Sequence, residues 1–231
     1  HYKNAEPNDI SPSELLSILV DAESAYRDTQ KAKRLLKAAK FKEQEACIEA
    51  LDYRKDRGLK KAAIIELTQN HWIQNHQNIL ITGPSGSGKS YLAQGLGNYA
   101  ARHGYSVYYV RIPKLPFYLL EAKTNGSYLG YLKRLAKNRI LILDDWGLSP
   151  VTEQDRQDLL EIIEDRHKAG STIVTSQLPV AGWHQHLGGG LTAEAILDRL
   201  LHSTHRFDLR APDSLRKEDK EKLTHSGQSE K

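Results

Sequence analysis

The feature that most constrains this chain is a glycine-rich run, Gly83-Pro84-Ser85-Gly86-Ser87-Gly88-Lys89-Ser90. The run satisfies every fixed position of the phosphate loop GxxxxGK[ST]. A short apolar segment at 78–82 precedes it and indicates a buried strand, and a helical pattern that opens with Tyr91 follows it. A strand, this loop and a helix in that order predict an α/β fold that binds a nucleoside triphosphate.

Each residue type in the loop has a physical role in holding phosphate. The three glycines allow backbone conformations closed to other residues, so that consecutive N–H groups can turn inward around a phosphate. Lys89 would reach the β- and γ-phosphates, and the Ser90 hydroxyl would ligate Mg²⁺ at the positive end of the helix. We therefore predict ATP and Mg²⁺ as cofactors. The predicted nucleotide contacts are Gly83, Pro84, Ser85, Gly86, Ser87, Gly88, Lys89, Ser90 and Tyr91. The alternative, a Gly/Ser-rich turn that matches by chance, is disfavoured by the strand and helix on either side.

A second motif, which is acidic, follows at residues 139–145, where a buried strand ends in two carboxylates. This is a Walker B arrangement, and its separation from Lys89 is compatible with a neighbouring strand of one domain. Asp144 would hold Mg²⁺ through its water shell, because magnesium prefers hard oxygen ligands. Asp145 would orient the water that attacks the γ-phosphate. Glutamate is usual at this second position, and aspartate is one methylene shorter, so we expect slow hydrolysis. An ordinary acidic strand end is the alternative.

Three further polar residues are candidates for catalysis. The end of the strand at 172–176 places small polar residues where a γ-phosphate sensor belongs. Gln177 is the first candidate and Ser176 the second; a polar strand end without function is the alternative. Arg199 lies late in a helix with apolar neighbours, so it needs an anionic partner. A finger that reaches the ATP of a neighbouring subunit would supply one. The alternative is an ion pair within the chain, with Asp198 or another carboxylate.

The remaining sequence divides into a helical part, a core and a tail. Residues 1–66 are predicted to form a small all-helical N-terminal appendage, which begins with a helix capped by Ser11, Pro12 and Glu14. Residues 67–217 alternate strand and helix, and their apolar strands predict a parallel, doubly wound core. The expected strands are 78–82, 106–111, 139–144, 172–176 and 205–209, and the expected helical segments are 89–102, 114–136, 152–168 and 192–202. The charged residues 218–231 are predicted to be disordered.

Composition narrows the class of protein further. No run approaches the roughly 18 apolar residues needed to span a bilayer, and no signal peptide opens the chain, so we expect a cytoplasmic protein without a membrane partner. The single cysteine, Cys47, excludes an internal disulfide and a cysteine cluster for zinc.

Positive charge is concentrated although the net charge is only +4. Residues 31–42 carry six basic side chains and no acidic one, on a predicted helix that would present Lys33, Lys37 and Lys40 on one side. Such a helix beside an ATPase core predicts contacts to backbone phosphates of DNA, which weaken with salt. The predicted DNA contacts are Lys31, Lys33, Arg34, Lys37 and Lys40. A solvated helix face is the alternative. Tyrosines at 108, 109, 118, 128 and 131 could stack on bases, but their spacing favours core or interface positions.

Together these motifs carry a resemblance. The phosphate loop, Asp144-Asp145-Trp146-Gly147, the Thr-Ser-Gln strand end, Asp198-Arg199-Leu200 and the closing Ser214-Leu215-Arg216-Lys217 occur in the order found in one group. The chain resembles the AAA+ ATPases of the IstB/DnaC group, and in particular IstB-like proteins, the ATP-binding transposition helpers of bacterial insertion sequences. The resemblance covers most of residues 15–217.

The resemblance implies a P-loop NTPase core of AAA+ type and assembly into homo-oligomers with ATP at subunit boundaries. It also implies that the assembled form binds duplex DNA and stimulates an IstA-type transposase. Arg199 matches the arginine-finger position and Arg216 a possible second sensor. Asp145 and Gln177 depart from the pattern, which bears on the hydrolysis rate rather than on nucleotide binding.

Other functions remain compatible with the sequence. A DnaC-type loader would bind a replicative helicase through its N-terminal segment and favour single-stranded DNA. A small-molecule phosphotransferase would use the same loop but would need an acceptor pocket and a basic lid, for which the sequence offers no convincing segment. A third alternative is a nucleotide-gated scaffold that scarcely hydrolyses ATP.

Overall fold

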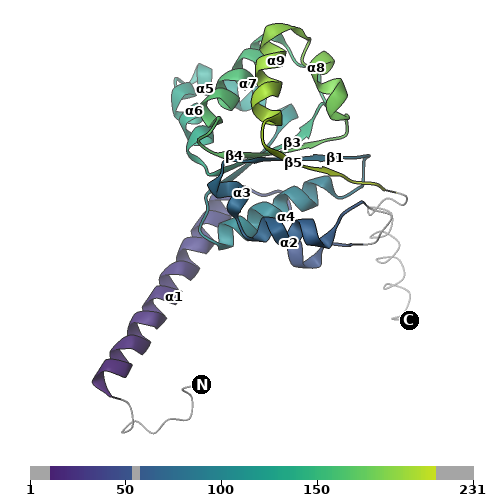
Figure 1. Cartoon of the computed structure of the whole chain (residues 1–231). Coiled ribbons are helices and arrows are strands. Elements are labelled where there is room, and N and C mark those ends of the chain that lie inside the picture. Colours follow the sequence, from purple (N-terminus) through teal and green to yellow (C-terminus); the bar gives the residue numbers. More distant parts are fainter. Residues whose placement is uncertain (1–10, 54–57, 212–231) are drawn as a thin grey trace, which may run out of the picture.

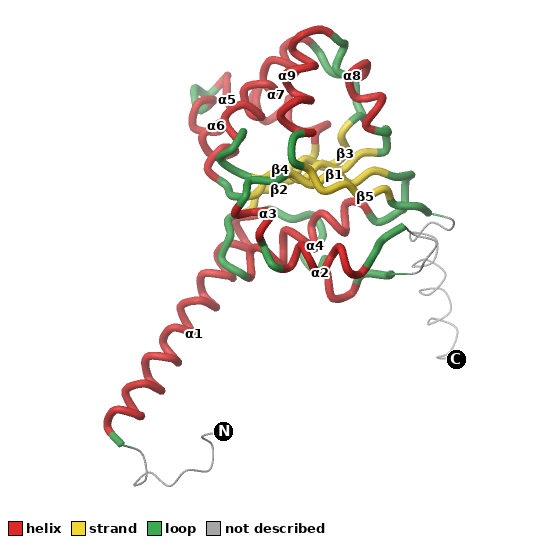
Figure 2. The backbone as a smooth tube through the Cα atoms, in the orientation of Figure 1, coloured by secondary structure: helices red, strands yellow, loops and turns green. Residues whose placement is uncertain are grey.

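The structure of the protein, a computed structural model, describes residues 11–53 and 58–211 (Figure 1). Within these residues, five parallel strands form one sheet, in the order β2-β3-β4-β1-β5 (Figure 2). The strands are β1 (Asn78–Thr82), β2 (Val107–Arg111), β3 (Ile140–Trp146), β4 (Ser171–Ser176) and β5 (Thr204–Asp208). Each predicted strand is present, with its ends shifted by two residues at most. The parallel α/β fold is therefore confirmed.

The strands are apolar on both faces because helices cover both faces. Alternate residues of a strand point to opposite sides of a sheet. Leu141 and Leu143 of β3 accordingly join one hydrophobic cluster, whereas Ile140 and Ile142 join a second one on the other face. All four side chains are fully buried. This double burial explains the continuous apolar runs that the sequence shows at its strands.

Helices form a layer on each side of the sheet (Figure 1). The first layer contains α5 (Leu115–Thr124), α6 (Tyr128–Lys137), α7 (Glu153–Arg166), α8 (Trp183–His186) and α9 (Gly190–Leu201). The second contains α1 (Pro12–Ala39), α2 (Lys61–Thr68), α3 (His71–Gln74) and α4 (Lys89–Arg102). Single turns of 3-10 helix lie at η1 (Ile48–Ala50), η3 (Ile112–Lys114) and η4 (Val180–Gly182). The two layers confirm the doubly wound arrangement.

Helix α1 projects away from the rest of the molecule (Figure 1). Its start matches the prediction, because Ser11 and Glu14 form a capping box with Pro12 in the first turn. Only its last turns reach the core: Ala39 is buried, and the half-buried Leu35 and Leu36 pack against the cluster on the α4 side of the sheet. Apart from the half-buried Ile18 and Ala32, the remainder of this 28-residue helix is exposed.

Helix α2 joins the N-terminal region to the core. Ile64 and Leu67 of α2 are buried in the same cluster as Ile79 of β1. The predicted boundary between residues 66 and 67 falls inside this helix, and the division into an N-terminal domain and a core stays a prediction. The predicted disordered tail at 218–231 lies outside the described residues. None of the described helices combines the length and apolarity needed to cross a membrane.

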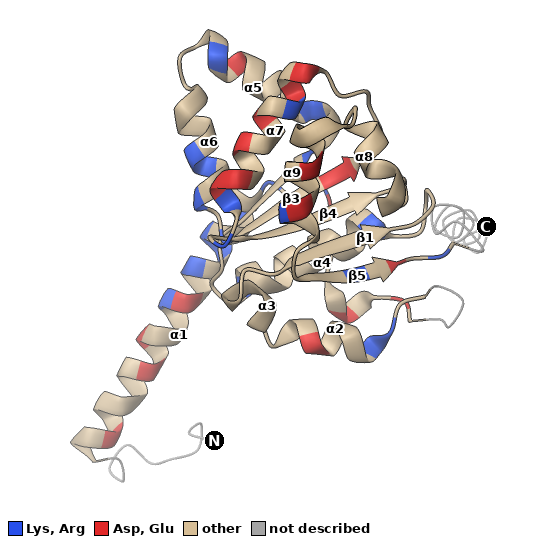
Figure 3. Cartoon of the chain, turned by 45° about the horizontal axis from the view of Figure 1, so that its top comes forward, with Lys and Arg blue, Asp and Glu red and all other residues tan. Residues whose placement is uncertain are grey.

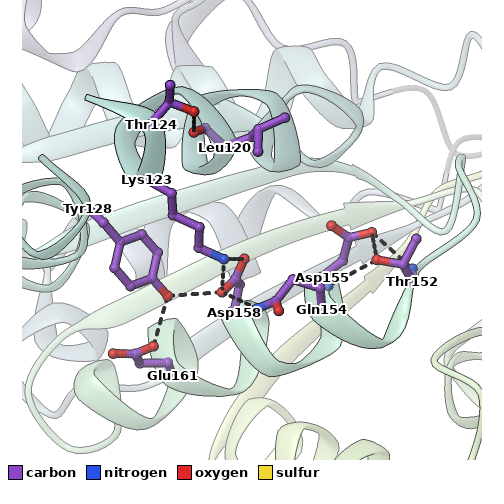
Figure 4. A network of polar contacts seen from close by, with 9 residues as sticks. All are labelled: Leu120, Lys123, Thr124, Tyr128, Thr152, Gln154, Asp155, Asp158 and Glu161. Atoms are coloured by element: carbon purple, nitrogen blue, oxygen red, sulfur yellow. Dashed lines mark hydrogen bonds and ion pairs between the residues drawn. The ribbon is translucent and has the colours of Figure 1, made fainter. Parts of the chain in front are cut away.

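A buried carboxylate fastens α5 and α6 to α7 (Figure 4). Asp158 of α7 is 4% exposed and accepts hydrogen bonds from the Lys123 ammonium at 2.7 and 2.8 Å. It also accepts from the Tyr128 hydroxyl at 2.9 Å and from the Gln154 amide at 3.1 Å. Tyr128 further donates to Glu161 at 2.9 Å. Because these donors come from three helices, the cluster fixes the helices that border the β2 edge of the sheet.

Candidate nucleotide-binding site

The predicted phosphate loop connects the carboxyl end of β1 to the first turn of α4. Gly83, Gly86 and Gly88 have φ values of +146°, +80° and +84°, in the region where residues other than glycine are strained. A Cβ at Gly83 would in addition clash with the carbonyl oxygen of Leu209. Lys89 is buried, and its ammonium donates to the carbonyl of Pro84 at 2.7 Å. The backbone thus has the turned conformation that the glycines predict.

Asp144 at the end of β3 is held by three hydroxyl groups. It is 2% exposed and accepts hydrogen bonds from Ser90 at 2.8 Å, from Tyr109 at 2.7 Å and from Thr175 at 2.5 Å. Burial, and then the negative charge of Asp144, raise the pKa of the Tyr109 hydroxyl, so that it remains a donor. The carboxylate and the Ser90 hydroxyl are therefore brought together, as the sequence predicts for a metal site.

The sequence suggested that the strand carrying Asp144 neighbours β1, but in the structure β3 and β1 are not adjacent. Strand β4 lies between them and pairs with both. The prediction of adjacency was wrong, but its consequence still holds. All the strands are parallel, so their carboxyl ends meet at one edge of the sheet. The Thr175 hydroxyl of β4 bridges the remaining gap by bonding to Asp144.

Asp145 lies at a β-bulge. Leu143 pairs with Val174 and Trp146 with Ser176, so β3 has one residue more than β4 over this interval. Asp145 has φ +65°, and its backbone N–H donates to the Thr175 hydroxyl at 3.1 Å. A bulge re-aims the side chain at this point, and such backbone strain is common at functional sites. The side chains of these consecutive aspartates thus have different partners, although the Thr175 hydroxyl bonds to the Asp144 carboxylate and to the Asp145 N–H.

The Asp145 carboxylate forms an ion pair with Arg111 at the end of β2. The Arg111 Nε donates to it at 2.7 Å, and the side chains of the arginine and the aspartate are 33% and 20% exposed. The hydrogen bond to Asp145 is the largest cause that raises the pKa of Arg111. The candidate catalytic carboxylate is therefore accessible to solvent and held by a cation on the edge strand.

The two sensor candidates differ in their surroundings. Ser176 is buried; its hydroxyl donates to the carbonyl of Trp146 at 2.8 Å and accepts from the N–H of Leu178 at 3.0 Å. Its carbonyl accepts from the Gly83 N–H at 3.2 Å, which ties β4 to the phosphate loop. Gln177 follows directly and is exposed. The hydroxyl of Ser176 is thus used within the fold, whereas the Gln177 amide is accessible, and the sensor role of either residue stays a prediction.

Arg199 lies at the amino ends of the strands, opposite the carboxyl ends where the phosphate loop lies. The side-chain amide of Asn78, at the start of β1, donates to the Arg199 carbonyl at 3.1 Å. The guanidinium pairs with Glu164 of α7 at 2.5 Å and donates to the carbonyl of Ala195 at 2.9 Å. The intrachain ion pair considered from the sequence therefore forms, with Glu164 instead of Asp198. The structure does not bring Arg199 to the phosphate loop of its own chain.

The remaining predicted residues lie at the periphery of the site or outside the described residues. The half-buried Tyr91 accepts a hydrogen bond from the Cys47 N–H at 3.4 Å, on the side of α4 that contacts the segment after α1. Arg216 lies outside the described residues. The predicted DNA contacts are exposed near the end of α1, where it meets the sheet (Figure 3); they are Lys31, Lys33, Arg34, Lys37 and Lys40.

Sequence reasoning missed three residues of the site: Tyr109, Arg111 and Thr175. Each lies at or near the carboxyl end of a buried strand, the edge to which the acidic pair also belongs. A polar residue that interrupts or ends an apolar strand was the available signal. Tyr109 was instead assigned to the core or an interface, and its ring is indeed 7% exposed.

The fold and the site together define a class of protein. A phosphate loop between β1 and α4, an acidic pair at the end of β3 and the strand order β2-β3-β4-β1-β5 are those of a P-loop domain of AAA+ type.

Comparisons with known proteins identify the family. Residues 1–223 match the family described as IstB-like ATP binding protein, and the chain belongs to this family. It is 46% identical over 219 residues to the insertion sequence ATP-binding protein y4pL of Sinorhizobium fredii, an alignment that covers 95% of this chain and 89% of that protein.

Among solved structures, the AMPPCP-bound DnaA of Aquifex aeolicus has a TM-score of 0.62 at 21% identity and covers 78% of this chain and 55% of that one. DnaI has a TM-score of 0.60 at 18% identity and covers 77% and 93%. These two likenesses concern the fold.

Proposed function

We propose that this protein is a Mg²⁺-dependent ATPase of an insertion sequence, which assembles on duplex DNA in the bacterial cytoplasm and assists a partner transposase of IstA type. The observation that carries the ATPase proposal is the joining of Ser90 and Asp144 at 2.8 Å beside a loop of left-handed glycines. Membership of the IstB-like family and the name of the Sinorhizobium relative support the link to an insertion sequence.

The residues present fit a nucleotide with its metal ion. The positive φ angles at Gly86 and Gly88 allow successive N–H groups to face one anion, at the start of a 14-residue helix. A hydroxyl and a carboxylate are the hard oxygen donors that Mg²⁺ prefers. We assign Ser90 and Asp144 to the metal and Lys89 to the phosphates. When bound, Mg²⁺ neutralises charge on the phosphate oxygens.

Asp145 is our candidate for orienting the attacking water. It is the partly exposed member of the acidic pair, and the bulge directs its side chain away from that of Asp144. Aspartate is one methylene shorter than the glutamate that is usual at this position, and Asp145 is already bound by Arg111. We therefore expect slow hydrolysis in the isolated subunit. Gln177, exposed at the same edge, is the accessible candidate for contacting the γ-phosphate.

Arg199 supports a site completed by a second subunit. Because it lies at the amino ends of the strands, its guanidinium faces away from the phosphate loop of its own chain. Its partner Glu164 is 54% exposed, so the pair can exchange for another anion at modest cost. We propose that Arg199 acts on ATP held by a neighbouring copy, where such a charge contributes several orders of magnitude to the hydrolysis rate.

Helix α1 supports the same assembly. Leu15, Leu16, Leu19 and Val20 form an apolar face along its first half, and each is more than half exposed. Burying such an apolar face against a partner lowers the free energy of a helix that is otherwise exposed. We therefore assign multimerisation to the N-terminal region and DNA contacts to the basic second half of α1 (Figure 3).

A mixing experiment tests the shared site. ATP hydrolysis is measured with duplex DNA for Lys89→Ala, for Arg199→Ala and for their mixture. Each variant alone should lose nearly all activity, because every site lacks either the loop lysine or the finger. The mixture should recover activity, because some interfaces combine an intact loop with an intact Arg199. A mixture as inactive as its parts, at a protein concentration where the unsubstituted chain assembles, would contradict a finger acting between subunits.

A capture experiment tests the partner. The full chain, with ATP and duplex DNA, is presented with the transposase of the same insertion sequence and, separately, with a replicative helicase. We expect retention of the transposase only. Retention of the helicase alone would favour the loader alternative, and ATP-dependent phosphorylation of a small molecule without DNA would favour the phosphotransferase.

A further inference from the structure

Two cavities in the described part of the chain carry more cations than carboxylates. The larger, the β2-edge cavity, has a volume of about 540 Å³ and is lined by one carboxylate, Glu121. Its cations are Lys40, Lys42, Arg111, Lys114 and Arg134. Because Lys40 also belongs to the basic segment 31–40, this cavity continues the proposed DNA-contacting surface of α1. Substitution of its cations is therefore expected to weaken duplex binding.

The smaller cavity, which we call the amino-end pocket, has a volume of about 200 Å³. The turns that enter β1, β4 and β5 line it, together with the last turns of α7 and α9. Those three strands are neighbours in the sheet. The basic side chains of the pocket are Arg166, Lys168, Arg199, His76, His167 and His202. None of the described residues that line it is a carboxylate. A concave surface with charge of one sign attracts a ligand of the opposite sign.

Arg166 is a buried cation without a counter-ion. It is 2% exposed, and its guanidinium donates to the carbonyls of Leu135 at 2.7 Å and Ser171 at 2.5 Å. Burial, and then the positive charge of Arg139, lower the pKa of Arg166 to about 9, so it is still charged at neutral pH. Among the described residues it forms no ion pair. Carbonyl dipoles solvate this charge, but an anion is needed to neutralise it.

Two nitrogen atoms of the lining are buried without a hydrogen-bond partner in the part of the chain that the structure describes. They are Nδ1 of His76 and Nε of Arg199. The guanidinium Nε always carries a proton, and either ring nitrogen of a histidine can carry one. Burial, and then the positive charge of Arg139, lower the pKa of His76. A ligand with several oxygen atoms would satisfy both donors, and its negative charge would raise that pKa again.

Lys168 adds a cation at the rim of the pocket. It directly follows the last residues of α7 and has φ +57°, at a position where glycine is the usual residue. Its side chain is exposed and forms no ion pair among the described residues. A lysine in this strained backbone conformation breaks a local rule, and such exceptions are common at functional sites.

The size of the pocket selects the kind of ligand. About 200 Å³ is below the roughly 300–1,000 Å³ of sites that enclose a whole drug-sized molecule. It nevertheless exceeds many times the roughly 15 Å³ that one water molecule requires. A phosphate group is of suitable size, because it is small and directs oxygen atoms to several sides at once. Its double negative charge also matches a lining with three cations better than the single charge of a carboxylate does.

We propose that the amino-end pocket binds a phosphate group, with Arg199, His76 and Lys168 as its donors and Arg166 as a buried counter-charge. Such a group has two sources: free phosphate, and the terminal phosphate of an ATP that a neighbouring copy holds. We favour the second source, because Arg199 is the proposed finger. In that respect the inference rests on the proposed function, to which it adds His76 and Lys168 as further residues that contact the phosphate.

The binding step is tested on the full chain without ATP or DNA. Inorganic phosphate is titrated at constant ionic strength while NMR follows the ring signals of His76, which the spectrum of His76→Asn assigns. These signals report on the pocket, because the phosphate loop lies at the other ends of the strands. We expect saturable shifts and a raised pKa of the His76 ring, because a bound anion favours its charged form. Signals that ignore phosphate would overturn the proposal.

The role of Lys168 is tested with Lys168→Gly, which removes the ammonium and relieves the backbone strain. We expect phosphate affinity to fall by about tenfold, while the midpoint of thermal unfolding stays unchanged or rises. Lys137→Gln removes an exposed charge outside the lining, and Asn70→Gly replaces another left-handed residue outside it. Both controls should retain the affinity. Equal affinity in all three variants, or a loss that accompanies a lower midpoint, would overturn this role.

A mixing experiment separates the two sources of phosphate. ATP hydrolysis with duplex DNA is measured for Lys168→Gly and for its mixture with Lys89→Ala. If the phosphate belongs to a neighbour's ATP, Lys168→Gly alone is slow, and the mixture recovers activity because intact pockets then face intact loops. If the phosphate is free, Lys168→Gly hydrolyses ATP normally but loses the response of the rate to added phosphate. A normal rate with an unchanged response would contradict both sources.

Failure of this inference can be told from failure of the proposed function. The NMR titration requires neither assembly, nor duplex DNA, nor a transposase. Phosphate binding at His76 in a chain that never assembles would support the pocket and refute the proposed function. Assembly and ATP hydrolysis without any response of His76 to phosphate would refute the further inference alone.

Discussion

Two groups of cations and tyrosines flank helix α5, and they have opposite environments. On one side, the Lys123 ammonium lies 4.8 Å from the centroid of the Tyr128 ring. Asp158 accepts hydrogen bonds from both residues, and Glu161 accepts one from Tyr128 (Figure 4). On the other side, Arg134 lies over Tyr131 in the β2-edge cavity without an ion-pair partner among the described residues. A cation beside a tyrosine stabilises the fold where it pairs with a carboxylate, and it remains available to a ligand where it forms no such pair. Substitutions on the two sides of α5 test this difference.

The largest effect is expected from removing the buried carboxylate. Asp158→Ala leaves the ammonium of Lys123 and the hydroxyl of Tyr128 without their main acceptor. We expect a loss of about 3 kcal/mol in the free energy of unfolding, because a charged hydrogen-bonded group is removed from a largely buried cluster. Urea denaturation measures it. The control is Asp165→Ala, an exposed position on the same helix, which should change stability by less than about 0.5 kcal/mol. Equal losses for the two variants would show that the cluster does not stabilise α5 and α6.

Removing one donor from the same cluster should have a smaller effect. Tyr128→Phe deletes a hydroxyl that donates to Asp158 and Glu161. We expect about 1 kcal/mol of destabilisation, the usual net contribution of a hydrogen bond. Tyr118→Phe is the matched control on the cavity side, where the ring is 40% exposed and should lose less. A larger loss at Tyr118 would reverse the comparison between the two groups.

A cavity cation should matter little for stability. Arg134→Gln removes an exposed guanidinium that forms no ion pair among the described residues. The free energy of unfolding should change by less than about 0.5 kcal/mol, in contrast to its expected effect on duplex binding. Thermal unfolding and the anisotropy of a labelled duplex, on the same preparation, measure both. A destabilisation as large as that of Asp158→Ala would mean that Arg134 serves the fold.

The smallest effect has the opposite sign. Asn125 lines the cavity, and its side-chain oxygen accepts hydrogen bonds from the N–H and hydroxyl of Ser127. Asn125→Asp keeps an acceptor there and adds a negative charge beside the cations. We expect a gain of about 0.3 kcal/mol in stability that fades with salt, together with weaker duplex binding. Unchanged duplex binding would argue against an anion site.

Much of the nucleotide site could be predicted because its residues are contiguous in the chain. The phosphate loop and the acidic pair each follow an apolar strand, and both lie where predicted, with Ser90 bonded to Asp144. Arg111 could not be assigned in this way, because its partner Asp145 is brought near only when β2 and β3 pair in register. Adjacency of β1 and β3 failed for the same reason: strand order depends on how the whole sheet packs.

Local features follow from the amino-acid sequence alone: the glycines that admit a turned backbone, the apolar runs buried on both faces, the capped start of α1 and the positions of the acidic pair. These depend on neighbouring residues and on periodicity, which a linear chain contains. Contacts between distant segments are what turn Arg199 away from its own phosphate loop, give the side chains of Asp144 and Asp145 different partners at a bulge, and place one arginine, Arg111, between a basic cavity and the acidic pair. Those arrangements depend on contacts between segments far apart in the chain, where packing of the sheet and its helices selects one geometry among many that the same local patterns allow.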